Sequence, residues 1–157
     1  MRVKNPNRLK FHGKPFHLEN TSLIDTNAVY VFSNYELPGA QPYEISNAAY
    51  CRFFPNGQVL FVACDTIPTA ETVNNGELGW QGYYKIKKNR LKIREFEIIN
   101  GGQIGLRWGH FKEGDILFYS NTPRTYFQSW KLMEKGDLKE RWRKVTVDGI
   151  HPIQLDW

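Results

Sequence analysis

The chain has 157 residues, a length that suits one domain and is too short for two ordinary ones. Apolar residues make up 41% and charged residues 24%, a globular balance that excludes a largely disordered or fibrous chain. The formal net charge of +5 is modest and does not by itself indicate a partner. Aromatic residues are frequent, at 15% of the chain, and no run of 18 apolar residues predicts a transmembrane helix.

The first 27 residues contain two prolines, five basic side chains and little apolar periodicity. We therefore expect a lead segment at residues 1–27, partly extended or disordered, followed by a single domain at residues 28–157. The basic start is not followed by an apolar run, so the sequence predicts no signal peptide. Two locations stay open: the cytoplasm or, if a signal has been trimmed, the cell envelope or the exterior.

Most of the following chain is predicted to form short β-strands. Runs rich in Val, Ile, Tyr, Phe and Trp favour a pleated surface, and turn signals separate them. The predicted strands are residues 28–34, 47–54, 58–64, 80–88, 91–99, 103–111, 115–120 and 125–133. Consecutive tight turns place sequence neighbours side by side, which is a meander. We predict an all-β, up-and-down meander barrel of about eight antiparallel strands.

The C-terminal part is predicted to differ from the strands. Residues 134–144 are expected to form one short helix, with Asp137 as its N-cap. The tail from Val145 to Trp157 contains Pro152 and forms either a ninth strand or a strap over the domain.

The turn at residues 54–58 predicts the register of the strands on either side of it. Its proline and glycine suit a type I turn with a glycine bulge, which places Phe54 opposite Gln58. This register puts Cys51 and Cys64 on opposite faces, so we expect no disulfide between them. Their spacing is also not that of a zinc or redox motif.

A second turn, of two residues at 88–89, pairs Ile86 with Leu91. Around it apolar side chains alternate with basic ones, as expected for strands with one buried and one exposed face. Beyond residue 93 the alternation changes phase. We predict a β-bulge near residues 94–95, which would absorb this change and bend the strand.

Three segments resemble, in this order, the strand and turn pattern of bacterial lipocalin-like (calycin) domains. They read Arg52-Phe-Phe-Pro-Asn-Gly-Gln-Val59, Gly82-Tyr-Tyr-Lys-Ile86-Lys-Lys-Asn89-Arg-Leu-Lys-Ile93 and Trp108-Gly-His-Phe-Lys-Glu-Gly-Asp-Ile-Leu117. The resemblance covers residues 28–133. It implies an eight-stranded up-and-down barrel whose interior holds one small apolar ligand, and it favours a cell-envelope protein.

The sequence contains no motif that is specific for catalysis. The four histidines lack metal-ligand spacing, and neither a G-x-S-x-G elbow nor a phosphate loop is present. We therefore expect no metal, no cofactor and no enzymatic activity. One enzymatic alternative stays open, a barrel hydrolase or isomerase that uses Glu95 with His110. The competing interpretation is structural, with Glu95 opposite Arg107 as a cross-strand ion pair.

We predict a non-enzymatic binding module that holds a small apolar or amphipathic ligand inside the barrel. Glu95, Arg107 and His110 are possible polar anchors for the ligand. The residues expected to line the interior are Phe53, Phe61, Tyr84, Ile86, Trp108, Tyr126 and Trp130. An eight-stranded barrel is also just narrow enough to be filled by its own side chains. The alternative is therefore a protein-interaction or inhibitor domain that has a filled barrel and uses its outer surface.

The strands around residues 88–89 carry the most concentrated positive charge of the chain. One face is predicted to present Lys85, Lys87, Arg90, Lys92 and Arg94. Like charges then lie opposite one another across the two strands. This face is either simply solvated or binds an anionic partner. Few rings accompany the charges, so we expect a protein rather than a nucleic acid as that partner.

Overall fold

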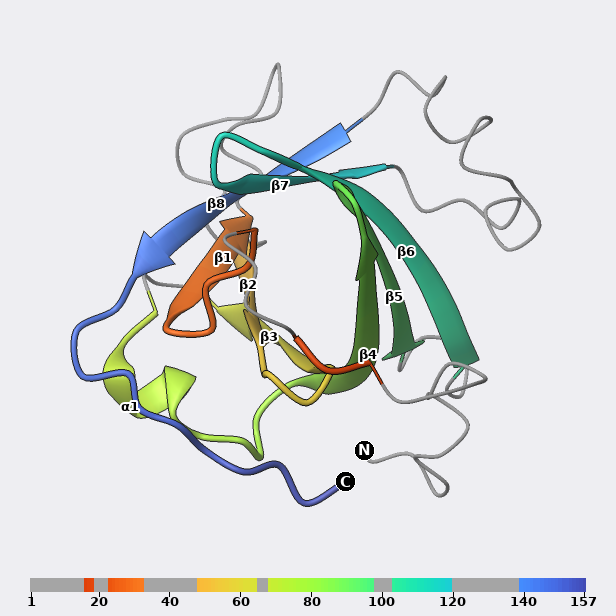
Figure 1. Cartoon of the computed structure of the whole chain (residues 1–157). Coiled ribbons are helices and arrows are strands. Elements are labelled where there is room, and N and C mark those ends of the chain that lie inside the picture. Colours follow the sequence, from red (N-terminus) through yellow and green to blue (C-terminus); the bar gives the residue numbers. More distant parts are fainter. Residues whose placement is uncertain (1–15, 19–22, 33–47, 65–67, 98–102, 120–138) are drawn as a thin grey trace.

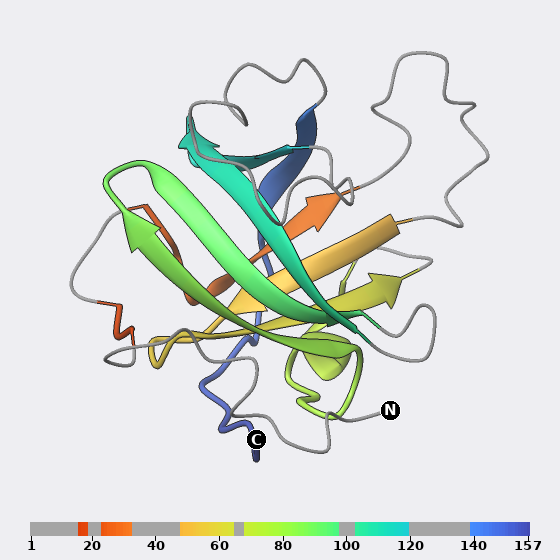
Figure 2. The same cartoon turned by 90° about the vertical axis from the view of Figure 1, so that its right-hand side faces the viewer.

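The computed structural model describes residues 16–18, 23–32, 48–64, 68–97, 103–119 and 139–157. Eight antiparallel strands follow one another around a closed barrel, and the last pairs with the first (Figure 1). The strands are β1 (Ala28–Phe32), β2 (Ala48–Phe53), β3 (Gln58–Cys64), β4 (Trp80–Lys87), β5 (Arg90–Glu97), β6 (Gln103–Lys112), β7 (Asp115–Tyr119) and β8 (Lys139–Thr146). The predicted all-β meander barrel of eight strands is confirmed. Figure 2 shows the strong mutual tilt of the strands that closure of such a barrel requires.

Both turns that fixed a register are confirmed. The amide of Phe54 donates to the carbonyl of Gln58 over 2.9 Å, and Gly57 adopts the positive φ of 88° that the glycine bulge needs. At the second turn Ile86 pairs with Leu91. The two cysteines are free and lie on opposite faces of the wall, as predicted.

Two predictions, one for a strand and one for the helix, are wrong. The pairing of β5 with β6 is continuous through residues 94–95, so no bulge occurs there. Residues 139–146 form strand β8 rather than part of a helix, because they close the barrel between β7 and β1. Within the described residues the one helix is α1 (Ala70–Val73), where Thr69 caps its start with a capping box, and residues 134–138 with the predicted N-cap Asp137 lie outside them. The predicted strand at 125–133 lies outside the described residues.

The tail is a strap rather than a ninth strand. Residues 147–157 run along the outside of the barrel past α1 (Figure 1). The buried side chain of Arg52 holds both segments, since it donates to the carbonyls of Val73 and His151. A second apolar cluster, which includes Val29, Tyr50 and Leu155, fills the space between strap, helix and wall. The described helix is too short to cross a membrane.

The two ends of the barrel differ. At the turn end, tight turns join β2 to β3, β4 to β5 and β6 to β7. Part of the predicted lead segment covers this end: Phe16 packs its ring on Tyr84, and the amide of Leu18 donates to the carbonyl of Pro55. The opposite end, where β1, β3, β5 and β7 finish, is called the mouth below.

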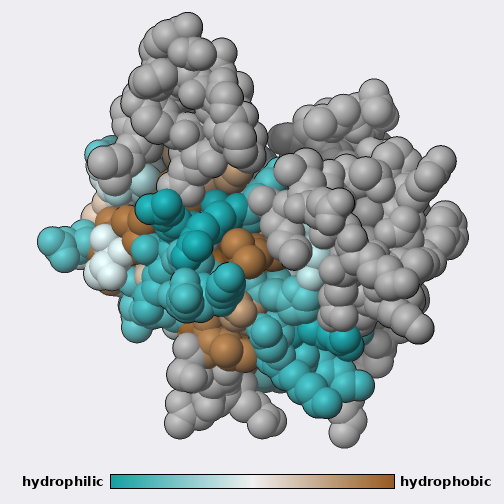
Figure 3. Space-filling model, turned by 90° about the horizontal axis from the view of Figure 1, so that it is seen from above, coloured by the Kyte–Doolittle hydropathy of each residue, from teal (hydrophilic) through white to brown (hydrophobic). Residues whose placement is uncertain are grey.

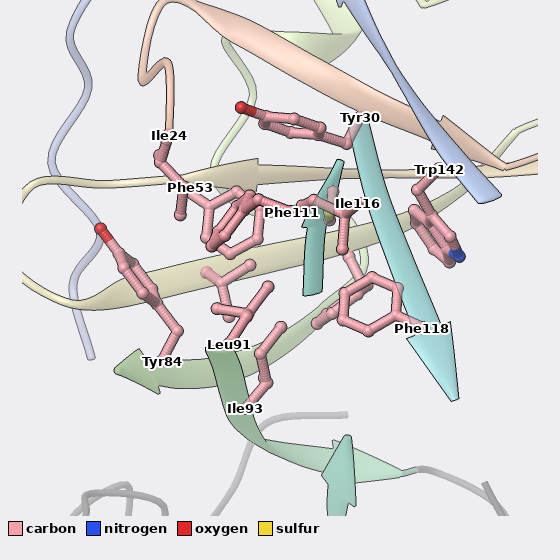
Figure 4. Close-up of a cluster of buried hydrophobic side chains, with 13 residues drawn as sticks. Ile24, Tyr30, Phe53, Tyr84, Leu91, Ile93, Phe111, Ile116, Phe118 and Trp142 are labelled. Atoms are coloured by element: carbon pink, nitrogen blue, oxygen red, sulfur yellow. The ribbon is translucent and has the colours of Figure 1, made fainter. Parts of the chain in front are cut away.

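The half of the barrel near the turn end is filled by its own side chains. Inward rings and branched aliphatic groups of β1 to β7 contact one another there, and the same cluster extends to Trp142 of β8 on the mouth side (Figure 4). Phe53 lies edge-on to Tyr30 at 5.5 Å and to Tyr84 at 4.9 Å between ring centroids. The Tyr84 hydroxyl donates to the carbonyl of Phe54, so the one polar atom of that ring is satisfied. This half therefore serves as the core.

Candidate binding site at the barrel mouth

The inward positions of the mouth half carry a group of charges. Glu95 on β5 faces the interior because it lies two residues from the buried Ile93 on the same face of the strand. Its direct partner on β6 is Gly105, which leaves room for the carboxylate. Arg107 projects from the next inward position of β6.

An ion pair forms diagonally between these two side chains. The Nη2 and Nε atoms of Arg107 donate to Glu95 Oε1 over 2.9 and 3.1 Å. The predicted ion pair of Glu95 with Arg107 is thus confirmed, although the register differs: Arg107 lies opposite Ile93 rather than Glu95. Diagonal neighbours in a sheet are within reach of long side chains, so the two-residue offset does not prevent the contact.

Two further polar side chains complete the group. Trp80, the first residue of β4, donates its indole N–H to the second oxygen of Glu95 over 3.4 Å. Glu140 on β8 accepts from Arg107 Nη1 over 3.5 Å and from the indole N–H of Trp142 over 3.2 Å. We refer to Glu95, Arg107, Glu140, Trp80 and Trp142 as the mouth cluster.

Aromatic rings surround the Arg107 guanidinium inside the barrel. Its central carbon lies 5.2 Å from the ring centroids of Phe61 and Phe118, and 5.6 Å from that of Trp142. These distances are typical of cation–π contacts. Burial disfavours the charged guanidinium, but the attraction and hydrogen bonds of Glu95, together with Glu140, outweigh it and raise the pKa of Arg107. Arg107 is therefore a permanent cation at the centre of the barrel.

The three charged side chains differ in their exposure to solvent. The side chain of Glu95 is 1% exposed, that of Arg107 16% and that of Glu140 34%. Inward positions beside them bear small side chains: Ala49 and Ala63 pair directly across β2 and β3. Ala63 is exposed and Ala49 half-buried, so solvent reaches the inner wall here. The mouth half thus differs from the filled half in its polarity and in its access to solvent.

The described residues that the sequence predicted as ligand-lining lie on two different sides of the barrel wall. Phe53, Phe61 and Tyr84 are buried in the interior, and Ile86 packs against them half-buried. Trp108 faces the opposite way, because it alternates with Arg107 along β6, and it clusters with Tyr119 and Leu106 on the outer face. Tyr126 and Trp130 lie outside the described residues.

The third predicted anchor, His110, is also on the outer face of β6. Its Nδ1 atom lies 2.5 Å from the hydroxyl of Tyr119. Glu95 points inward and His110 outward, so the wall of the barrel separates the two. Glu95 and His110 therefore do not form the pair that the enzymatic alternative requires.

Sequence reasoning missed Trp80, Glu140 and Trp142 as site residues. The sequence predicts a helix over residues 134–144, so Glu140 and Trp142 are not expected on the barrel wall. A signal was nevertheless present: Glu140, Trp142 and Lys144 alternate with Arg141 and Arg143, which is also the period of a strand.

The basic outer face forms as predicted. Lys85 pairs with Lys92 and Lys87 with Arg90, and Tyr83 pairs with Arg94. The ammonium of Lys92 lies 4.3 Å from the ring centroid of Trp108, and burial together with the charges of Lys85 and Arg94 lowers its pKa. The outward positions of β4, β5 and β6 contain no acidic residue within the described ranges.

Little apolar surface accompanies these features. The part of the chain that the structure describes exposes one large apolar side chain, Leu78. Seen from the side of β7 and β8, the described surface is mainly hydrophilic, with small separate apolar areas (Figure 3). The described residues also contain no group of three or more His, Cys, Asp and Glu side chains that could hold a metal ion.

Comparisons with protein-family models, with curated proteins and with solved structures found no match. The closed eight-stranded antiparallel barrel is consistent with a calycin-like architecture. A barrel architecture by itself establishes neither a family nor a function, and function resides in the site.

Proposed function

We propose that the protein is a non-enzymatic binding module that holds a small amphipathic ligand in the mouth half of the barrel. The observation that carries this proposal is the mouth cluster: buried charges and indole N–H groups lie among aromatic rings, next to inward alanines that solvent reaches. Ligand sites typically combine apolar walls with a few convergent polar groups. The mouth half has this composition, whereas the turn-end half is already occupied by packed rings.

The arrangement of the mouth cluster favours binding over catalysis. Glu95 accepts hydrogen bonds from Arg107 and Trp80, and it is almost fully buried. A general base must reach the proton that it takes from a substrate. Glu95 is instead engaged by its neighbours, and His110 lies beyond the barrel wall. A fixed polar group of this kind is suited to orienting a ligand.

The test combines detection of a natural ligand with a variant that fills the mouth. Native mass spectrometry of freshly purified protein should reveal a co-purified small molecule. In Ala63→Phe the new ring would occupy the solvent-reached inner wall, so the ligand should be lost. The matched control is Thr146→Phe, which adds the same ring at an exposed position of β8 at the turn end. The proposal would be overturned if neither the wild-type protein nor the Thr146→Phe control carried a ligand or bound an amphipathic probe.

A second candidate function is supported by the basic outer face. Three strands present only neutral and basic residues outward in the described ranges, and this pattern suits an acidic protein surface. Binding to immobilised poly-L-glutamate should weaken with salt and fall strongly when Lys85, Lys87, Lys92 and Arg94 are replaced by Ser. Equal retention of the variant would exclude this function, and preferential binding of single-stranded DNA would replace the protein partner by a nucleic acid.

A further inference from the structure

The charges of the mouth cluster do not cancel. Glu95 and Arg107 form a close pair, whose two charges offset one another. Glu140 is left with only a long contact of 3.5 Å to the same guanidinium. Within the described residues, the cluster therefore has one negative charge in excess, and it resides on the member nearest the solvent. An anionic ligand placed there would be repelled, whereas a cation would be attracted.

Glu140 also has an oxygen available for a ligand. Its Oε2 atom accepts both the indole N–H of Trp142 and the N–H of Arg107. Its Oε1 atom accepts no hydrogen bond from any residue that the structure describes. The side chain is anchored through one oxygen and presents the other at a position where it is 34% exposed. A charged donor such as an ammonium forms its strongest hydrogen bonds with such an oxygen.

The walls next to Glu140 suit the apolar part of an organic cation. Phe32 stacks on Trp142 with 5.6 Å between ring centroids, and Phe61 stacks on Trp80 at the same separation. Indole faces attract cations more strongly than other rings do. The interior already accommodates one organic cation, since the Arg107 guanidinium lies over three rings. Charge, hydrogen bonding and ring surface at the mouth point to the same chemical class.

We infer that the ligand of the mouth is an organic cation, an amine whose ammonium group binds Glu140 and whose aromatic or alkyl portion packs against the partly buried rings of Trp80 and Phe32. This inference rests on the proposed function, because it names the class of ligand for the same site. It adds a direction of selectivity: amines over neutral alcohols, and alcohols over carboxylates of similar size.

Three probes of nearly equal size separate these possibilities: 2-phenylethylamine, 2-phenylethanol and 3-phenylpropanoate. Isothermal titration of the full chain at neutral pH should show the amine binding about tenfold tighter than the alcohol, with the carboxylate weakest. Glu140→Gln should reduce the affinity for the amine to that for the alcohol and leave the alcohol unchanged. Glu140→Asp keeps the charge and should retain the preference for the amine.

The matched control is Glu113→Gln, which removes an acid that is 73% exposed on the turn at the other end of the barrel. It should leave all three affinities unchanged, and thermal melts should show that the variants are folded. Binding of the alcohol or the carboxylate without a preference for the amine would overturn this inference and leave the proposed function intact. Binding of none of the three, together with no co-purified ligand, would overturn both.

Discussion

Removal of Arg107 should destabilise the fold more than removal of its partner. In Arg107→Met the carboxylate of Glu95, which is 1% exposed, would keep a single donor, the indole N–H of Trp80 at 3.4 Å. Removing one member of a buried ion pair typically costs about 3–5 kcal/mol, because the other charge stays buried and uncompensated. We expect a loss of this size for Arg107→Met.

Glu95→Gln should be milder. Arg107 would keep Glu140 and the three rings around its guanidinium, and it retains some access to solvent. A cost of about 1–3 kcal/mol is typical of a buried hydrogen-bonding group whose partner is weakened. The double variant Glu95→Leu with Arg107→Met removes both charges, and it should recover most of the stability that Arg107→Met loses.

Urea unfolding at neutral pH measures all three free energies of unfolding, provided that the slope with denaturant is the same for each variant. Arg107→Met should be the least stable of the three variants, below both Glu95→Gln and the double variant. The reasoning would be refuted if Arg107→Met lost less than about 1 kcal/mol, because a truly desolvated carboxylate cannot lose its cation so cheaply. It would also be refuted if the double variant were no more stable than Arg107→Met, since removal of the second charge should recover stability.

Two further predictions concern glycines and pH. Gly79→Ala should lower the free energy of unfolding by about 3 kcal/mol or more, because a Cβ there would lie 1.8 Å from the carbonyl oxygen of Phe61. Gly114 has a similar positive φ, but a Cβ there would meet nothing within 4 Å. Gly114→Ala should therefore cost only about 1–2 kcal/mol in the same urea assay. The hydrogen bond from Lys144 lowers the pKa of Asp25 below its ordinary value of 3.8, so the pair stabilises the fold above that pH and loses its effect as the pH falls through the lowered pKa. Because both side chains are more than a third exposed, Asp25→Asn should cost less than about 1 kcal/mol at neutral pH. This cost should vanish as the pH falls through the lowered pKa, and a cost that persists in strong acid would contradict this assignment.

The local turn chemistry made much of the barrel predictable. A glycine bulge after Phe54 and a two-residue turn after Lys87 each allow one register, and that register determines which side chains face inward. From these two turns the facing of β2 to β5 follows up to Ile93. The orientation of the basic outer face follows from the same alternation.

The inward orientation of Glu95 depends on a residue that is distant in the sequence. An inward carboxylate contradicts the usual alternation, so the phase change after Ile93 appeared to require a bulge. The strand instead continues in phase, with Glu95 inward and Phe96 outward, because Arg107 supplies the compensating cation. Nothing within β5 itself indicates that partner. The error is therefore one of long-range electrostatics rather than of local conformation.

Strand β8 was misassigned for a related reason. The segment that contains Trp142 is rich in long charged side chains, which favour a helix locally, and only its pairing with β7 and β1 makes it a strand. Once closure of an eight-stranded barrel is assumed, the segment must supply the last strand, and Trp142 must be the residue that faces the core. Alternation then places Glu140 inward, one step nearer the mouth. The acid that we propose to bind the ligand therefore follows from the topology, although no motif in the sequence marks it.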